Sequence, residues 1–379
     1  MRPRLGAAVL AAVTAATALV AVSGPPSRAT PSHAAHAAPR LALASVTNTG
    51  FVTRSGTHLL LNGHRFRFTG VNIYNANSRN NCWYTLGSGS ALSQSLSQVR
   101  RGQEVFRAWF FQSEATRNGV RDWSAFDHTL AAAKAAGLRV IPVLVNQWGQ
   151  CETWKNYADG YKSESWYRSG YRLKPTSPGM PNTYRRWVRQ VVTRYRNNPT
   201  IMAWQMVNEA EDKTRYGGGC SSTAPASLRS FAADISGLIK SIDKRHLVSI
   251  GTIGTGQCGS SGSAYKTLHA LPKVDLCEYH DYQPGAMPGD RWNGLATRLA
   301  QCAALHKPLF VGESGIRTSG SLSPVQRAAI VGRKLTAQMT AGVVGELLWD
   351  WRNAAHGGTA DAGYEIGPAD PALAVLAAH

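Results

Sequence analysis

Two glutamates each close an apolar, strand-like segment, and acids in that position can do chemistry. Glu209 follows the run Ile-Met-Ala-Trp-Gln-Met-Val-Asn of residues 201–208, and Glu313 follows Lys-Pro-Leu-Phe-Val-Gly of residues 307–312. Because a carboxylate is costly to bury without partners, we expect such an acid at a solvent-filled mouth rather than inside a core. The two glutamates therefore predict a paired acid–base site.

The elements that must position these acids alternate along the chain. Apolar, strand-like segments occupy residues 66–72, 105–110, 140–146, 201–208, 246–252, 274–279, 308–312 and 345–350. Helical patterns between them include residues 123–136, 182–196, 226–242, 291–305 and 324–341. This alternation predicts an α/β fold, a (β/α)8 TIM barrel. A short N-terminal β-hairpin that turns at Asn62 and Gly63 is expected to close the bottom of the barrel.

In such a barrel, catalytic groups lie at the C-terminal ends of the strands. Glu209 follows the fourth predicted strand and Glu313 the seventh, so the two acids should face each other across the mouth. Paired carboxyl groups suit glycoside hydrolysis, and a separation of about 5 Å would let one of them attack the sugar with retention of configuration. The alternative, that each acid caps a helix or joins a surface ion pair, explains one glutamate better than it explains both.

Several short motifs occur in an order that resembles glycoside hydrolase family 5, a family of retaining barrels. They are Asn208-Glu209 after a tryptophan-containing strand, His280-Asp281-Tyr282, Gly312-Glu313-Ser314, and Trp349 on the last strand. The resemblance extends from residue 66 over nearly all of the remaining chain. It implies that Glu209 is the acid/base, that Glu313 is the nucleophile, and that Arg107 hydrogen-bonds the nucleophile.

These roles carry expectations about charge. Arg107 should lower the pKa of Glu313 and keep this carboxylate ionised, whereas Glu209 should stay protonated in less polar surroundings beside the charge of Glu313. Around them, Asn208 is expected to contact the sugar 2-hydroxyl, Tyr282 to hold Glu313, and His280 to bind the acid/base or the sugar. Trp349 is expected to stack on the sugar. Trp351 shares its face by strand period and competes for this role, with a place in the core as the alternative for one of the two. Five further acids are expected to be solvated or ion-paired: Asp281, Asp350, Glu211, Asp212 and Glu278.

The third strand indicates the substrate. It continues as Val145-Asn146-Gln147-Trp148, where the family commonly has a histidine, and this departure resembles the endo-β-1,4-mannanase branch. We therefore expect β-mannan as the polysaccharide substrate, with Trp148 in the binding site and no metal or cofactor. The alternatives are an endo-β-1,4-glucanase (cellulase) or another β-glucanase on the same machinery and, in another class, a barrel that binds polysaccharide without cleaving it.

The N-terminal residues and the cysteines indicate export. Two arginines precede an uncharged, alanine-rich run, so residues 1–38 are expected to be a secretory signal and N-terminal segment, although an uncleaved anchor is the alternative. Residues 46–379 are expected to form a single catalytic barrel, secreted, extracellular and monomeric. An even count of six cysteines favours disulfides over buried free thiols. Their connectivity is not fixed by the sequence, but three pairs would join neighbouring loops: Cys82 with Cys151, Cys220 with Cys258, and Cys277 with Cys302.

The formal net charge of +19 raises the alternative of a nucleic-acid or wall-binding protein. The basic residues are scattered, however, and the densest cluster, residues 184–196, has the spacing of a solvated helix face. The sequence contains no zinc-finger spacing, RNA-binding motif or phosphate-binding glycine loop. We therefore expect no nucleic-acid partner and, after signal cleavage, no membrane.

Overall fold

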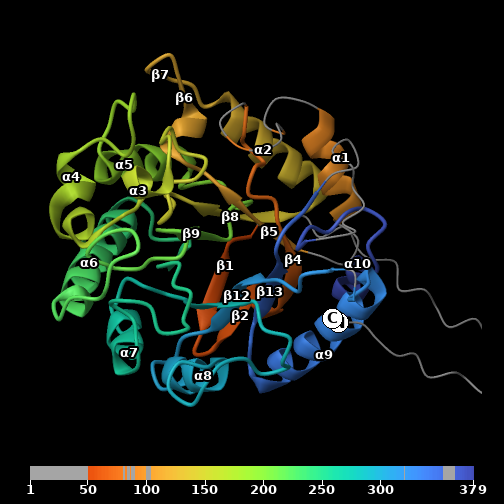
Figure 1. Ribbon diagram of the computed structural model, residues 1–379. Coiled ribbons are helices and arrows are strands. Elements are labelled where there is room, and N and C mark those ends of the chain that lie inside the picture. Colours follow the sequence, from red (N-terminus) through yellow and green to blue (C-terminus); the bar gives the residue numbers. More distant parts are fainter. Residues whose placement is uncertain are drawn as a thin grey trace, which may run out of the picture. The chain divides into compact units, whose positions relative to one another are not determined.

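The computed structural model describes residues 50–79, 82, 86, 90–99, 104–319, 321–352 and 363–379 (Figure 1). The predicted signal segment, residues 1–38, lies outside the described residues. All the elements discussed below belong to one unit, Ser45–His379. Among the described residues, no helix combines the length and the apolar character that crossing a membrane requires.

Eight parallel strands of the described chain form a closed barrel, which confirms the predicted TIM fold. They are β4 (Phe68–Asn72), β5 (Val105–Trp109), β8 (Arg139–Val143), β9 (Ala203–Gln205), β10 (Leu247–Ser249), β11 (Cys277–Asp281), β12 (Leu309–Ser314) and β13 (Gly345–Leu348). Their order in the sheet is β10-β9-β8-β5-β4-β13-β12-β11, and a parallel bridge between Ser249 and Leu276 joins the two outer strands. Two boundaries matter for the site, because β11 continues to Asp281 and β12 continues to Ser314, beyond their predicted ends.

Helices surround this barrel, as Figure 1 shows. Those of seven residues or more are α1 (Ser90–Val99), α2 (Ser124–Ala136), α5 (Tyr184–Tyr195), α6 (Ala224–Ile242), α7 (Ser263–His269), α8 (Leu295–Ala303), α9 (Pro324–Ala341) and α10 (Pro371–Ala377). The five predicted helices are present with shifts of at most four residues at an end. Helix α9 has the sharpest boundaries, because Ser323 and Gln326 form a capping box at its start and Gly342 takes a left-handed conformation at its end.

The predicted basic helix face is confirmed in α5. Arg186 and Arg189 are exposed, whereas Arg185 pairs with Asp234. Buried residues of the opposite face include Trp187 and contact the barrel core. The amphipathic spacing of this segment therefore accounts for its cluster of arginines.

A small antiparallel sheet closes the lower end of the barrel. Its strands are β1 (Val52–Ser55), β2 (His58–Leu61) and β3 (His64–Phe66). The predicted turn joins β2 to β3, and both Asn62 and Gly63 have the positive φ that a tight hairpin turn requires. Three of its apolar side chains pack against the first residues of the barrel strands in one cluster, which comprises Val52, Leu59, Phe66, Phe68, Val105, Ile141, Met202, Ala203, Leu247, Leu276, Phe310, Val344 and Leu347.

All six cysteines lie in the described part of the chain and form the three predicted disulfides. Cys82 pairs with Cys151 and Cys220 with Cys258, and both bonds join loops that follow barrel strands. The third bond joins Cys277 of β11 to Cys302 of α8. None of the six is a free thiol.

Candidate active site

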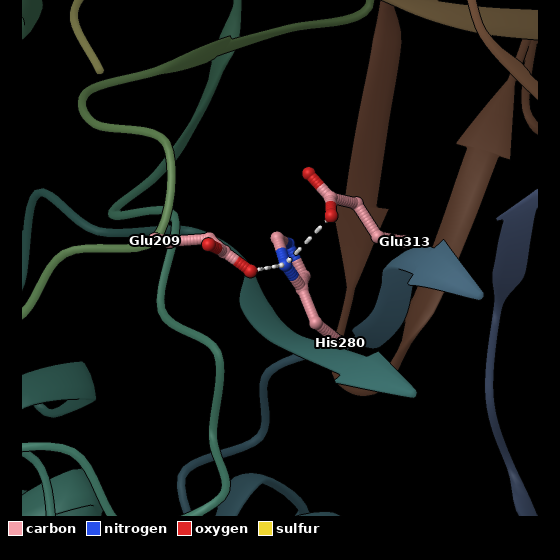
Figure 2. A group of neighbouring side chains, drawn as sticks. All are labelled: Glu209, His280 and Glu313. Carbon is pink, nitrogen blue, oxygen red and sulfur yellow. Dashed lines mark hydrogen bonds and ion pairs between the residues drawn. The ribbon is translucent and has the colours of Figure 1, made fainter. Parts of the chain in front are cut away.

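Glu209 and Glu313 meet at the mouth of the barrel, as their positions in the sequence predict. Glu313 lies within β12, and Glu209 lies four residues after the end of β9. One carboxylate oxygen of each glutamate and one ring nitrogen of His280 all lie within 4.8 Å of one another (Figure 2). Glu209 has a φ of 60°, a left-handed conformation that is uncommon for a residue with a side chain and is concentrated at functional sites.

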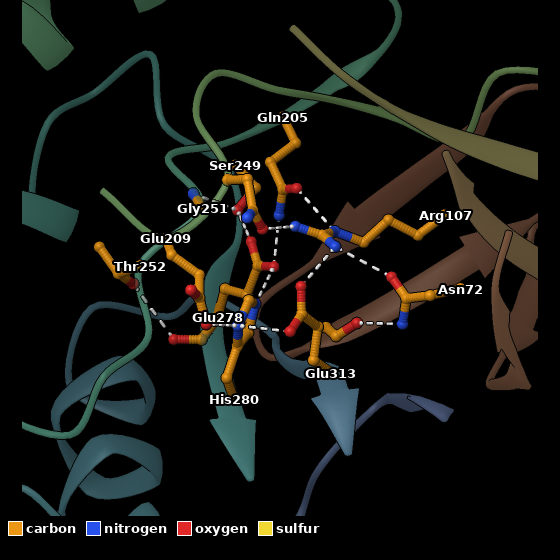
Figure 3. A network of polar contacts seen from close by, with 12 residues as sticks. Asn72, Arg107, Gln205, Glu209, Ser249, Gly251, Thr252, Glu278, His280 and Glu313 are labelled. Atoms are coloured by element: carbon orange, nitrogen blue, oxygen red, sulfur yellow. Dashed lines mark hydrogen bonds and ion pairs between the residues drawn. The ribbon is translucent and has the colours of Figure 1, made fainter. Parts of the chain in front are cut away.

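A buried arginine holds Glu313. The guanidinium of Arg107, fully inaccessible to solvent on β5, donates from Nη1 to Glu313 Oε1 at 2.8 Å and to Asn72 Oδ1 at 2.9 Å. Its Nε donates to Gln205 Oε1 at 2.7 Å (Figure 3), and its Nη2 donates to Asn208 Oδ1 at 2.6 Å. Because all three guanidinium nitrogens are engaged, Arg107 fixes the orientation of the Glu313 carboxylate.

The second oxygen of Glu313 accepts a hydrogen bond from the Tyr282 hydroxyl at 2.6 Å. Glu209 has different partners and is more open to solvent, with 17% of its side chain exposed against 4% for Glu313. The indole of Trp148 donates to Glu209 Oε2 at 2.6 Å, and His280 Nδ1 lies 3.0 Å from Glu209 Oε1. Apart from His280, which also approaches Glu313, the two acids thus have different supporting groups.

His280 lies between three carboxylates. Its Nδ1 is 3.0 Å from Glu209 Oε1 and 3.5 Å from Glu313 Oε2, and its Nε2 is 3.2 Å from Glu278 Oε1. Burial disfavours a charged imidazole, but the charges of Glu313 and Glu209 and the hydrogen bonds to Glu209 and Glu278 outweigh it and raise the pKa of His280 to about 10. His280 is therefore an imidazolium in the free site at neutral pH.

Both charge expectations for the glutamates are wrong, for different reasons. Burial is the largest influence on Glu313 and, together with the charge of Glu209, raises its pKa above the ordinary value despite His280 and Arg107. Burial also acts to raise the pKa of Glu209, but the hydrogen bond and charge of His280, aided by Trp148, lower it below the ordinary value. The expectation of a protonated Glu209 omitted the proton that His280 holds.

The spacing of Glu209, His280 and Glu313 is close enough for a metal ion, and within the described chain it is the one such group of three or more. Each of these side chains already has a hydrogen-bond or ion-pair partner, and Arg107 supplies a positive charge within 2.8 Å of Glu313. The donor set therefore fits the sharing of a proton among acids better than the binding of a cation.

The remaining predicted residues lie at the mouth, with one error. Asn208 accepts from Arg107, and its amide nitrogen donates to Asn146 Oδ1 at 3.0 Å. Trp349 stacks on Tyr74 with ring centroids 5.3 Å apart. The expectation that Trp351 shares the face of Trp349 is wrong, because β13 ends at Leu348 and Trp351 lies in the hydrophobic core, 2% exposed.

Two cavities open at this mouth. One, of about 460 Å³, is lined by Trp148, Trp154 and Tyr157, and it reaches Glu209 through Trp148, which donates a hydrogen bond to that glutamate. The other, of about 580 Å³, is lined by Tyr74, Trp109 and Trp349. Both include Gln150 and Cys151 in their lining, so they adjoin each other. Aromatic side chains of this kind can stack on the apolar faces of sugars.

The sequence-based reasoning missed a tier of buried polar residues beneath the two glutamates. Glu278 was expected to be solvated or ion-paired like other acids near the mouth. It is ion-paired with His280, but it is also fully buried on β11, where it accepts hydrogen bonds from Gln205 and from Ser249. The strand period could have indicated this burial. Gln205, Ser249 and Glu278 each come two residues after an apolar residue of the cluster at the lower end of the barrel, so each points to the same inward face.

Comparisons with known proteins agree with this geometry. Residues 139–284 match a family model described as GH family 5 beta-mannosidase-like. Mannan endo-1,4-beta-mannosidase A of Hypocrea jecorina is 25% identical over 374 residues, with 92% of this chain and 76% of the relative covered. The Podospora anserina protein of the same name is 28% identical over 335 residues, covering 78% of this chain and 81% of the relative.

Solved structures show the same fold. The endo-1,4-beta-mannanase of Rhizomucor miehei superimposes with a TM-score of 0.67 at 20% identity, covering 86% of this chain and 97% of the other. A pair of neighbouring glutamates at the mouth of a TIM barrel, the match to the family model and the similarity to the curated relatives indicate the same class of enzyme. The chain is a glycoside hydrolase, and its residues 139–284 are similar to the mannosidase-like members of glycoside hydrolase family 5.

Proposed function

We propose that this protein is a secreted, retaining endo-β-1,4-mannanase in which Glu313 is the nucleophile and Glu209 the acid/base. The observation that carries the mechanism is the approach of one oxygen from each carboxylate to within 4.8 Å. This spacing fits the ~5 Å of retaining enzymes and leaves too little room for the water of an inverting enzyme, which needs ~6.5–9.5 Å.

The two sets of partners support this division of roles. Arg107 and Tyr282 each bind one oxygen of Glu313, so this carboxylate is aimed and kept from rotating, as a nucleophile requires. Glu209 is more exposed and bonds a histidine, so it has both access to the leaving oxygen and a source of a proton.

Hydrolysis then takes two steps. Glu313 attacks the anomeric carbon while Glu209 protonates the departing glycosidic oxygen, which leaves a glycosyl ester on Glu313. Glu209, now a carboxylate, removes a proton from water, and the water oxygen attacks the same carbon and releases Glu313. Two inversions give net retention.

The cavities support cleavage within a chain rather than at its end. The cavity beside Trp148 adjoins the acid/base, where the leaving portion of a polysaccharide would lie. The cavity with Trp349 offers a second platform next to it, for the portion that becomes attached to Glu313. A groove that continues on both sides of the scissile bond suits an endo-acting enzyme.

The choice of mannan rests on the relatives, whose names describe mannan endo-1,4-beta-mannosidases. Secretion is supported by the signal-like N-terminal sequence and by three disulfides, since such bonds persist in oxidising compartments. A cellulase-like specificity would use the same catalytic groups and is separated from the mannanase by substrate testing.

The test is hydrolysis of defined β-1,4-manno-, gluco- and xylo-oligosaccharides by the mature protein, with products identified by length and by anomer. We expect internal cleavage of mannan oligosaccharides, first release of the β-anomer, and loss of activity in Glu313→Gln and Glu209→Gln. Release of the α-anomer would rule out the covalent intermediate. Preferential cleavage of gluco-oligosaccharides would replace mannan as the substrate, and inertness on every β-glycan would end the enzymatic proposal.

A further inference from the structure

Glu278 is buried directly beneath the two proposed catalytic glutamates. It lies on β11, two residues before His280, and is fully inaccessible to solvent. The Ser249 hydroxyl donates to Glu278 Oε2 at 2.6 Å, the Gln205 amide donates to Oε1, and His280 Nε2 lies 3.2 Å from Oε1. A buried carboxylate with this many donors is held as part of a site rather than solvated.

These contacts complete a continuous buried network, in which side chains link one catalytic acid to the other. Figure 3 shows its members around the mouth. In order they are Glu313, Arg107, Gln205, Glu278, His280 and Glu209. Gln205 is central to this order, because its oxygen accepts from Arg107 while its amide nitrogen donates to Glu278.

The backbone leaves a space that fits Glu278. Gly312, the residue before Glu313, has no side chain, and a Cβ at this position would lie 2.1 Å from Glu278 Oε1 and 3.1 Å from His280 Nε2. Any other residue at position 312 would displace this contact. The glycine of the Gly312-Glu313-Ser314 motif therefore has a physical role in the buried network.

The two ring nitrogens of His280 face two different carboxylates. Nδ1 faces Glu209 and Nε2 faces Glu278. A neutral imidazole has one N–H and would leave one carboxylate facing a lone pair, whereas an imidazolium can donate to both. The geometry alone thus places two protons along the line Glu209, His280, Glu278 when both carboxylates are ionised.

Resting on the function proposed above, we propose that Glu278 is a positioning residue that keeps a proton on His280, and that this proton is the one that Glu209 delivers to the leaving oxygen. Glu278 acts through His280 and does not itself touch the substrate. The glycoside hydrolase would therefore enter its first step with the acid's proton stored one hydrogen bond away from the acid.

The protons balance in both steps. In the first step the N–H bond at His280 Nδ1 breaks as an O–H bond forms at Glu209 Oε1. This O–H bond then breaks as the same proton passes to the glycosidic oxygen, whose bond to the anomeric carbon breaks while Glu313 bonds to that carbon. His280 becomes neutral and keeps its Nε2 proton toward Glu278. In the second step Glu209 removes a proton from water and returns it to His280 Nδ1. No proton is taken from bulk solvent during the cycle.

Charged and titratable groups from several strands influence the protonation of His280 between Glu209 and Glu278. Glu209, Glu278 and Glu313 favour the imidazolium, and Arg107 of β5 balances part of their negative charge. Tyr282 also contacts Glu313 through its hydroxyl. Removing the charge of Glu278 leaves Glu209 and Glu313 beside Arg107, so one of the three acids that support the proton on His280 is lost.

The test compares wild type with Glu278→Gln, which keeps the shape of the side chain and removes its charge. We expect the basic limb of the kcat/KM profile on mannan oligosaccharides to move at least ~1 pH unit toward acid, which corresponds to a loss of at least ~10-fold at pH values above the limb. On an aryl β-mannoside with a dinitrophenyl leaving group, which departs without protonation, we expect a change below ~3-fold.

The matched control is Glu346→Gln. Glu346 of β13 is equally buried, and the charges that act on it are Lys334 and Asp281, so its loss should leave the pH profile and the ratio between the two substrates unchanged. An unchanged basic limb in Glu278→Gln, or an equal loss on both kinds of substrate, would reduce Glu278 to a structural role and overturn the proposal.

A second measurement applies if Glu278→Gln does not fold. It uses the wild type and does not depend on enzymatic activity. Nitrogen NMR of histidine-labelled wild type, with the His280 signals assigned by their loss in His280→Gln, should show both ring nitrogens protonated at neutral pH. A ring with one proton would overturn the proposal. Inertness of the wild type on all glycans would contradict the proposed function and leave this measurement intact.

Discussion

The lower and upper halves of the same barrel are built from opposite kinds of side chain. At the lower end, Val105, Ala203, Leu247 and Leu276 belong to the apolar cluster beneath which the N-terminal sheet packs. Two residues further along the same four strands stand Arg107, Gln205, Ser249 and Glu278, all fully buried. Because successive side chains of a strand alternate between faces, these pairs occupy the same inward face one step apart.

The interior of the barrel therefore serves two functions, in an apolar layer and a polar layer that lie two residues apart along each strand. The apolar layer supplies burial, which stabilises the fold without direction. The polar layer costs desolvation and is tolerated because its members saturate one another with hydrogen bonds. We therefore expect changes in the lower layer to act on stability alone and changes in the polar layer to act on catalysis as well.

Arg107→Met should give the largest effect, because it would remove the buried cation that hydrogen-bonds Glu313 and orients its carboxylate. We expect a loss of about 3–5 kcal/mol in the free energy of unfolding and of ~10³-fold in kcat/KM. Denaturant titration and steady-state kinetics on mannan oligosaccharides measure the two quantities. A variant with the stability and activity of the wild type would mean that Arg107 does not hold the nucleophile.

Phe310→Ala tests the lower layer. Phe310 is fully buried in the apolar cluster and packs against Phe68 with ring centroids 6.1 Å apart. Its removal should cost about 3–5 kcal/mol of unfolding free energy, with kcat/KM within ~2-fold of wild type at temperatures where the variant is folded. A fall in kcat/KM as large as that of Arg107→Met would show that the two layers are not separable.

The pH dependence of kcat/KM in the wild type tests the protonation states of Glu313 and His280 in the polar layer. Glu313 must be ionised to attack, and its pKa is raised above 4.5, so kcat/KM should rise with pH through an acid limb above that value. His280 must keep its proton, and its pKa is about 10, so kcat/KM should fall as pH rises through about 10. A basic limb near neutrality would contradict a stored proton on His280.

Trp148→Phe should have the smallest effect. It removes the hydrogen bond to Glu209 Oε2 but keeps an aromatic ring at the rim of the cavity. We expect a ~10-fold fall in kcat, since hydrogen bonds to charged groups contribute about 1.5–3 kcal/mol, with little change in stability. Kinetics on long and short mannan oligosaccharides would check this, and a change confined to KM would assign Trp148 to substrate binding alone.

Most of the fold could be predicted from the sequence, because each strand and helix carries its own local pattern. The apolar segments and the amphipathic segments alternate visibly, and both Asn62 and Gly63 suit the turn that they form. The ends of strands were less predictable. Residues 280 and 281 and residues 313 and 314 extend β11 and β12 because neighbouring strands pair with them, and pairing is not visible along one segment.

The candidate site was predictable where chemistry and position coincide in the sequence. Glu209 and Glu313 stand out because they end apolar segments, and Arg107 stands out as a cation inside one. Glu278 did not, because an acid near a strand end looks the same whether it is solvated or buried. Only its neighbours on three other strands, Gln205, Ser249 and Gly312, distinguish the two cases.

The sequence by itself thus determined the barrel, the two glutamates and their strands, because periodicity and residue type are local properties. The tertiary structure decided the charges, since a pKa depends on every group that burial brings near it. Closure of the eight strands places His280 among Glu209, Glu278 and Glu313. These carboxylates raise the pKa of His280, so its ring is a cation at neutral pH. The proton on His280 therefore depends on residues from several strands and cannot be inferred from any one segment of the sequence.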